Sequence, residues 1–126
     1  MESFKSILVD IDTTVAVHPA LDRAIRLARK CGAKLTITDV LTVPAYARRY
    51  LPSSVEEEMA TRRRERLAEL IDAAAGVSVE SRLLVGRPAT VLIHEVLRSD
   101  HDLLVRCLAA TGPPLNRGHS ARSTWN

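Results

Sequence analysis

Ile7-Leu8-Val9-Asp10-Ile11-Asp12 and Val85-Gly86-Arg87-Pro88 are the two stretches of this sequence that say most about its structure. The first is an apolar run that ends in carboxylates shortly before a helical pattern. The second is the end of a strand, followed by a glycine and by a proline that can open a helix. In open α/β folds, such strand-to-helix turns lie at the carboxyl ends of the strands, where ligands bind. The two stretches therefore predict an α/β fold and the position of its binding site.

Four strand-like segments alternate with helical patterns along the chain. The segment at 4–11 is almost continuously apolar, as in the middle of a parallel sheet, whereas 77–85 alternates apolar and polar residues, as in a half-exposed edge strand. Segments at 33–43 and 102–107 complete the set. Strands that alternate with helices form a parallel sheet joined by right-handed crossovers. We therefore expect an open parallel sheet with helices on both faces.

Each helical pattern predicts a buried face. The helix that opens at Pro19 is expected to bury Leu21, Ala24, Ile25, Ala28 and Cys31. The long helix that begins near Ser53 is expected to bury Val55, Met59, Leu67, Leu70, Ile71 and Ala74. Arg63 interrupts that stripe, and we interpret it as a residue that lays its stem on apolar surface and its head in water. The helix after Pro88 is expected to bury Ala89, Leu92, Ile93, Val96 and Leu97.

The composition is that of one globular domain. The chain has 126 residues, of which 46% are hydrophobic and 26% charged, and its formal net charge is +3. The arginines at positions 62–64 and 66 have Glu58, Glu65 and Glu69 three or four residues away on the helix, which favours a solvated ion-pair face over a nucleic-acid surface. No apolar stretch is long enough to span a membrane. The two cysteines lack C-x-x-C spacing, which favours free thiols in the cytoplasm.

Three carboxylates, those of Asp10, Asp12 and Asp39, are expected at the carboxyl edge of the sheet. They could form a metal site or a phosphate-accepting site, Asp12 could contact an adenine, or they could be loop carboxylates that cap a helix. The histidines have no metal-ligand spacing and are interpreted as solvated or capping residues. Cys107, beside Arg106, is interpreted as a buried thiol. No nucleophile motif is present, so we expect no catalytic and no metal-binding residue, with a weak ATPase as the enzymatic alternative.

Several short stretches match one protein family in order and spacing. They are residues 5–9 followed by Asp12, residues 20–28 with Gly32 and Ala33, the strand up to Val40, residues 85–89, and residues 102–105. Over about residues 4 to 107 the chain resembles the universal stress protein family, and most of all those members that carry two such domains in tandem.

The resemblance implies a flavodoxin-like sheet of strand order 3-2-1-4-5, a homodimer and, in one branch of the family, ATP binding. In that branch the acid after the first strand contacts adenine, and a valine late in the second strand lines the same pocket. By position, Asp12 and its neighbours match the first element. The candidate nucleotide-binding residues are therefore Ile11, Asp12, Thr13, Val40, Arg106 and Cys107, and the candidate ligand is ATP or AMP.

The C-terminal part departs from the family pattern. Cys107 and Ala110 stand where two glycines of the phosphate-binding stretch are expected, and Ser120-Ala121 stands in place of Gly-Ser. Side chains at these positions obstruct the approach of backbone N–H groups to phosphate, so we expect weak or lost ATP binding. The fifth strand is also missing, so we expect a domain of strand order 3-2-1-4 at 1–107 and an irregular tail at 108–126.

The missing strand leaves the segment at 102–107 as an open edge, at which another chain can pair. The sequence therefore predicts a non-enzymatic regulatory module of the stress response, of the universal stress type, that forms a homodimer. The alternative is a sensor that binds ATP or AMP in a pocket at the carboxyl ends of the first, second and fourth strands. Neither interpretation involves nucleic acid or a membrane.

Overall fold

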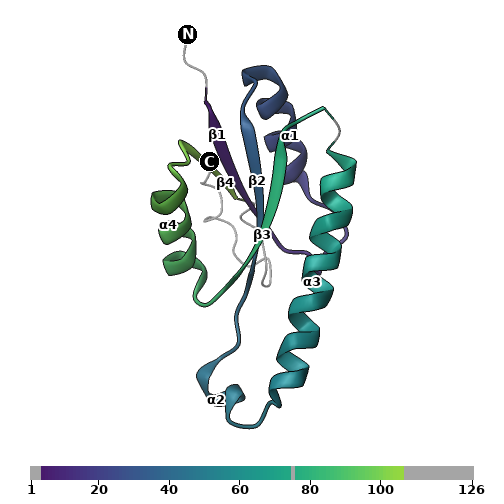
Figure 1. The fold of residues 1–126 in the computed structure, drawn as a ribbon, viewed down its shortest axis with the longest axis vertical. Helices are drawn as coiled ribbons and strands as arrows, with labels where there is room; N and C mark the ends of the chain where they lie inside the picture. The colour runs from purple at the N-terminus through teal and green to yellow at the C-terminus, as the bar shows by residue number, and fades with distance from the viewer. Residues whose placement is uncertain (1–3, 75, 107–126) are drawn as a thin grey trace, which may run out of the picture.

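Over the residues that the structure describes, 4–74 and 76–106, the fold is a four-stranded parallel sheet with helices on either side (Figure 1). The structure is a computed structural model of the chain. Its strands are β1 (Ser6–Ile11), β2 (Lys34–Leu41), β3 (Val79–Val85) and β4 (Leu103–Arg106). Its helices are α1 (Pro19–Cys31), α2 (Ala45–Arg48), α3 (Ser53–Ala73) and α4 (Pro88–Ser99). The strands are parallel and follow the order β3-β2-β1-β4, which confirms the predicted sheet.

The strands are shorter than the sequence predicts. β1 begins at Ser6 rather than at position 4, and β2 ends at Leu41 rather than at position 43. Apolar character alone overestimates the length of a strand, because the ends are set by pairing with the neighbouring strand. The connector after β2 also contains the short helix α2, which was not predicted. The predicted end of β4 at Cys107 and the predicted tail at 108–126 lie outside the described residues.

The face of the sheet toward α1 and α3 holds the main core. Residues that pair across a ladder share a face, and this register places Ile7 and Val9 of β1 beside Leu35 and Ile37 of β2. Figure 1 shows α1 and α3 on this side of the sheet and α4 on the other. Helices therefore cover both faces, as predicted. The helix residues buried in this core are Ala20, Leu21, Ala24, Ala28 and Leu67.

Helix α3 buries only part of its predicted stripe. Leu67 is 1% exposed, but Val55 and Met59 are each 37% exposed, which contradicts the prediction. The reason is geometric, since Figure 1 shows the first turns of α3 extending past the end of the sheet, where there is no core to cover. None of the helices in the described part of the chain, α3 included, has the length and apolarity that a membrane span needs.

Helix α4 also turns a different face inward from the one predicted. Leu92 is buried as expected, but Ile93 and Leu97 are 59% and 70% exposed, and Glu95 is buried. The sheet surface under α4 includes Arg82, whose Nε lies 3.2 Å from Oε1 of Glu95. Pairing between these two charges compensates for burying the carboxylate, so α4 is oriented by an ion pair as well as by apolar packing.

His101 is buried, which contradicts the expected solvated or capping role. Its Nδ1 lies 2.8 Å from Oγ of Ser6, and its Nε2 lies 3.7 Å from Oε2 of Glu95. Next to it, the Asp102 carboxylate accepts hydrogen bonds from the backbone N–H groups of Lys5 and Ser6, at 2.9 and 3.0 Å. These contacts join the start of β4 to the start of β1. They lie at the amino end of the sheet, opposite the edge at which a ligand site is expected.

Gly86 lies in the turn between β3 and α4, and its substitution tests this part of the fold. Its φ is +142°, a conformation that L residues with side chains rarely adopt, and a Cβ there would lie 2.8 Å from Cγ1 of Val91. Gly86→Ala is expected to lower the free energy of unfolding by about 2–4 kcal/mol, because backbone strain and overpacking both contribute. Urea denaturation measures the change.

Gly32→Ala is the matched control. Gly32 ends α1 with a φ of +67°, but nothing lies within 4 Å of a Cβ placed there. Only the backbone cost of about 1–2 kcal/mol is therefore expected. Equal losses of stability in the two variants would contradict the role given to the contact with Val91.

Candidate functional site

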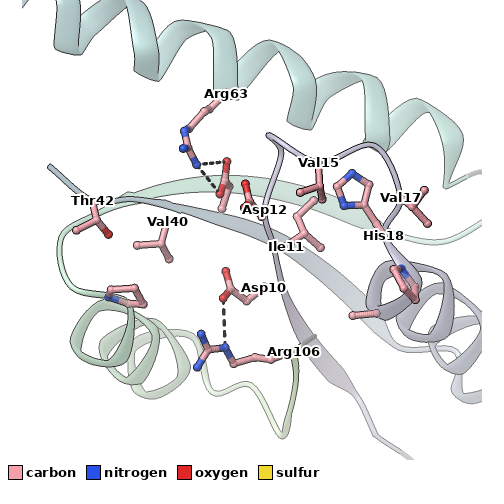
Figure 2. A pocket seen from close by; sticks show the side chains of 14 residues that line it. Asp10, Ile11, Asp12, Val15, Val17, His18, Val40, Thr42, Arg63 and Arg106 are labelled. Atoms are coloured by element: carbon pink, nitrogen blue, oxygen red, sulfur yellow. Dashed lines mark hydrogen bonds and ion pairs between the residues drawn. The ribbon is translucent and has the colours of Figure 1, made fainter. Parts of the chain in front are cut away.

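A pocket of about 620 Å³ opens at the carboxyl ends of the strands (Figure 2). It lies between the neighbouring strands β1 and β4, where the helical connections go to opposite sides of the sheet. Helix α1 joins β1 to β2 on one side, and α4 joins β3 to β4 on the other. Such a point in an open parallel sheet leaves a crevice between the connections. The pocket is lined by Asp10, Ile11, Asp12, Val15, Val17, His18, Pro19, Ala20, Asp39, Val40, Thr42, Arg63, Pro88 and Arg106.

Asp12 follows β1 and closes a tight turn. Its Oδ1 accepts hydrogen bonds from the backbone N–H of Thr14, at 2.9 Å, and from the Thr14 hydroxyl, at 2.6 Å. A carboxylate that accepts two hydrogen bonds is stabilised in its charged form, so these bonds lower the pKa of Asp12. Asp12 is exposed at the pocket. It therefore presents a stable negative charge to a ligand.

Asp39 and Arg63 form a largely buried ion pair between β2 and α3. The Nη1 of Arg63 lies 3.0 Å from each carboxylate oxygen of Asp39. The Arg63 side chain is 21% exposed and the Asp39 side chain 2% exposed. The Thr13 hydroxyl also donates to Oδ2 of Asp39. The interpretation of Arg63 as a residue with its head in water is therefore wrong. A buried carboxylate needs a cation, and Asp39 draws the guanidinium of Arg63 to the pocket wall.

Asp10 and Arg106 form a second pair, on the side of the sheet toward α4. Residues 10 and 106 are partners across the β1–β4 ladder, and Nε of Arg106 lies 3.3 Å from Oδ2 of Asp10. Burial raises the pKa of Asp10, and the nearby charge of Arg106 only partly opposes this effect. The other oxygen of Asp10, Oδ1, is buried without a hydrogen-bond partner among the described residues.

The structure brings together four of the six residues predicted as a nucleotide site. Ile11, Asp12, Val40 and Arg106 line the pocket. Thr13 is buried beside it and bonds to Asp39 rather than lining it. The sixth predicted residue, Cys107, lies outside the described residues.

Several pocket residues were not predicted as site residues. The one signal for Arg63 in the sequence is its place in the apolar stripe of α3, which does not say whether the charge is buried. Val15, Val17 and His18 lie in the loop after β1, where no periodicity guides a prediction. The aspartates of the expected acidic cluster do share one edge. Within residues 4–74 and 76–106, however, no group of three His, Cys, Asp or Glu side chains is arranged to hold a metal ion.

The pocket combines apolar walls with a charge balance close to neutral. Valine, isoleucine, proline and alanine side chains offer apolar surface to a flat or apolar ligand group. Among the lining residues, three aspartates and two arginines leave one net negative charge, with histidine neutral. Such a site favours a neutral or weakly charged ligand over a polyanion.

Comparisons with known proteins relate the chain to one family. The model of the universal stress protein family matches residues 3–111. The solved structure of universal stress protein UspA from Lactobacillus plantarum has a TM-score of 0.76 and 19% identity, and the match covers 93% of this chain and 86% of that chain. A family protein from Burkholderia pseudomallei has a TM-score of 0.63 and 25% identity, over 81% of this chain and 80% of that one.

A third similar structure is a universal stress protein in complex with cAMP. Its TM-score is 0.58 and its identity 22%, and the match covers 90% of this chain and 80% of that one. At these identities the UspA and cAMP-complex structures establish likeness of fold. No curated protein matches the chain.

Removing the cation of the buried pair tests the assignment of Arg63. Arg63→Met is expected to lower the free energy of unfolding by about 2–4 kcal/mol, because the buried carboxylate of Asp39 loses its counter-charge. The loss is below that of a fully buried pair because the Arg63 side chain is 21% exposed. Chemical denaturation measures it.

The neighbouring Arg62 provides the matched control. It pairs with Glu58 at 3.0 Å, but the two side chains are 75% and 63% exposed. Arg62→Met should therefore cost less than about 1 kcal/mol. Similar losses in both variants would show that Arg63 is an ordinary surface residue.

Asp10 and Asp12 should give opposite pH effects on stability. The raised folded-state pKa of Asp10 means that its contribution to stability is lost as pH rises through that pKa. The lowered pKa of Asp12 means that its contribution is lost as pH falls through its folded-state pKa. Relative to the wild type, Asp10→Asn should thus gain stability as pH rises above about 3.8, and Asp12→Asn should lose stability as pH rises toward about 3.8 from below. Urea denaturation at pH values on both sides of 3.8 measures the two trends, and trends of the same sign would refute the two environments.

Proposed function

Because the chain belongs to the universal stress protein family, we propose that it is a regulatory module of the stress response that binds an adenine nucleotide of low charge, such as AMP or cyclic AMP. The observation that carries this proposal is the pocket at the carboxyl ends of the strands. Its volume of about 620 Å³ is within the range of sites for small organic ligands. As the sequence resemblance implies, the proposed working form of the module is a homodimer.

The walls of the pocket suit a nucleoside. Ile11 and Val40 offer apolar surface for a purine ring, and the exposed carboxylate of Asp12 can accept a hydrogen bond from an N–H or O–H group. By position these are the residues that match the nucleotide-binding pattern of the family. The similar universal stress protein in complex with cAMP supports an adenine nucleotide as the ligand class.

The charges in the pocket favour ligands with few phosphates. The three aspartates repel phosphate, and each of the two arginines is already paired with one of them, Arg63 with Asp39 and Arg106 with Asp10. A triphosphate would have to compete with both pairs, whereas a nucleoside or a cyclic monophosphate brings little or no added repulsion. The departures from the family's glycine pattern at Cys107 and Ala110 argue in the same direction. We therefore propose weak ATP binding.

The proposed module binds its ligand without turning it over. The pocket-lining residues that the structure describes include no serine, cysteine or lysine, and the hydroxyl of Thr42 donates to the backbone carbonyl of Gly86. The arginines that could stabilise a transferring phosphoryl group are paired with carboxylates. A binding module whose ligand shifts its conformation or its partners is the function that this arrangement supports.

Calorimetric titration with adenosine, AMP, cyclic AMP and ATP tests the proposal. We expect the first three ligands to bind and ATP to bind at least about tenfold more weakly, because charge repulsion works against it. A ligand at 100 times its dissociation constant should also stabilise the protein by about 2.7 kcal/mol in thermal denaturation.

Asp12→Ala should weaken binding, and Asp22→Ala is its control, since Asp22 lies on α1 and is not a pocket-lining residue. Failure of every one of these nucleotides to bind at millimolar concentration would refute the proposed function. ATP binding as strong as AMP binding would refute the charge argument alone.

A further inference from the structure

Arg106 is the arginine of the pocket wall that keeps donors available to a ligand. Its Nε lies 3.3 Å from Oδ2 of Asp10, and its side chain is 43% exposed. No hydrogen bond joins its two terminal nitrogens to another described residue. Figure 2 shows these nitrogens turned away from the contact with Asp10. Because a guanidinium carries five N–H donors, most of those of Arg106 remain open at the pocket.

Arg63, the other arginine of the described lining, is held by the protein itself. Its Nη1 lies 3.0 Å from both carboxylate oxygens of Asp39, and its side chain is 21% exposed. The Asp39 side chain is 2% exposed, so a ligand that drew Arg63 away would leave a buried carboxylate without its counter-charge. Of the two arginines, Arg106 is therefore the one that can bind an anionic group of a ligand.

Asp10 limits how much negative charge Arg106 can accept. Residues 10 and 106 are partners across the β1–β4 ladder, so the sheet fixes the carboxylate beside the guanidinium. The Asp10 side chain is 13% exposed, and charges in such a position repel each other more strongly than in water. The guanidinium can bind one phosphate, but each further phosphate adds repulsion and finds no unpaired arginine in the described lining.

We propose that Arg106 is a specificity-determining residue, which binds the single phosphate of the nucleotide through its terminal N–H groups while its Nε stays beside Asp10. This inference rests on the proposed function and names the part of the ligand that the protein recognises. The recognised group is one phosphate, present as a monoester in AMP and as a cyclic diester in cyclic AMP. Guanidinium donors match phosphate oxygens in both geometry and charge.

Asp10 acts on the ligand through Arg106, without touching it. The carboxylate orients the guanidinium by its contact with Nε, and its negative charge lowers the attraction of Arg106 for phosphate. Asp10 is thus a positioning residue that sets the number of phosphates the pocket accepts.

Calorimetric titration of the wild type, Arg106→Met and Arg106→Lys with adenosine, AMP and cyclic AMP tests the role of Arg106. We expect Arg106→Met to bind both nucleotides roughly ten- to a hundredfold more weakly than the wild type does, the range for hydrogen bonds to a charged group. Adenosine has no phosphate, so its affinity should stay the same. Arg106→Lys keeps the charge but not the forked donors, and its loss should be smaller.

Asp10→Asn tests the role of the neighbouring charge. Without the carboxylate charge, affinity for AMP should rise by about three- to tenfold, and affinity for ATP should rise further because ATP carries more phosphate charge. Arg106→Met in the Asp10→Asn background leaves no partly buried carboxylate unpaired, so it provides the comparison if Arg106→Met alone does not fold. The double variant should bind AMP at least about tenfold more weakly than Asp10→Asn does.

Arg66→Met is the matched control. Arg66 also lies 3.3 Å from a carboxylate, that of Glu69, and its side chain is 47% exposed, but it does not line the pocket. Its replacement should leave all affinities unchanged. Denaturation curves of each variant show that it is folded at the titration temperature.

The possible failures are distinguishable. If the wild type binds neither adenosine nor AMP nor cyclic AMP, the proposed function fails and this inference fails with it. If the wild type and Arg106→Met bind AMP and cyclic AMP equally well, Arg106 does not bind the phosphate, while the proposed function stands. If Arg106→Met weakens adenosine binding as much as AMP binding, Arg106 only shapes the pocket and the inference is overturned. An AMP affinity that falls or stays the same in Asp10→Asn would refute the role given to the charge of Asp10.

Discussion

The ion pair between Asp39 and Arg63 joins the sheet to helix α3 at the place where the pocket forms. Parallel strands bring their carboxyl ends to one edge, and in this chain that edge collects the carboxylates of Asp10, Asp12 and Asp39. A buried carboxylate is tolerated only with a cation or hydrogen-bond donors nearby. Asp39 has Arg63 and Thr13, and Asp10 has Arg106. The pocket exists in its present form because these partners arrive from three different elements of the fold.

The two faces of the sheet are stabilised by different kinds of contact. The face under α1 and α3 is apolar, and burial of its aliphatic side chains supplies most of the hydrophobic stabilisation. The face under α4 buries Leu8 and also carries polar contacts, among them the ion pair of Glu95 with Arg82 and the hydrogen bond of His101 with Ser6. The pocket lies at the carboxyl edge of the sheet, where the two faces meet. Asp39 and Arg63 line it on the face toward α1 and α3, and Asp10 and Arg106 line it on the face toward α4. A ligand there would contact both layers, which gives a regulatory module a way to couple binding to the packing of either helix layer.

Family membership and pocket chemistry lead to the same ligand class from separate starting points. The family match gives the family, and the similar structure in complex with cAMP supports the proposal of an adenine nucleotide. The charges of the pocket, taken alone, favour a ligand that carries few phosphates and presents hydrogen-bond donors to aspartates. The departures from the glycine pattern after β4 reinforce this selection, since they lie in the sequence where phosphate contacts are expected. A low-charge nucleoside or nucleotide satisfies all three considerations.

Apolar periodicity and the turns from strand to helix are local properties, so the amino-acid sequence predicted the parallel sheet directly. The strand order and four pocket residues came from the resemblance to the universal stress protein family. Asp12 could be placed at this edge from its position after a strand, and Val40 was placed in the pocket by the resemblance. The tertiary structure alone decided which charges are buried: Arg63 and Glu95 turn inward, while Ile93 and Leu97 remain exposed. Periodicity describes one helix at a time, whereas burial depends on what the facing surface offers. A polar or charged partner across the interface outweighed the helix's own pattern, and that partner is distant in sequence.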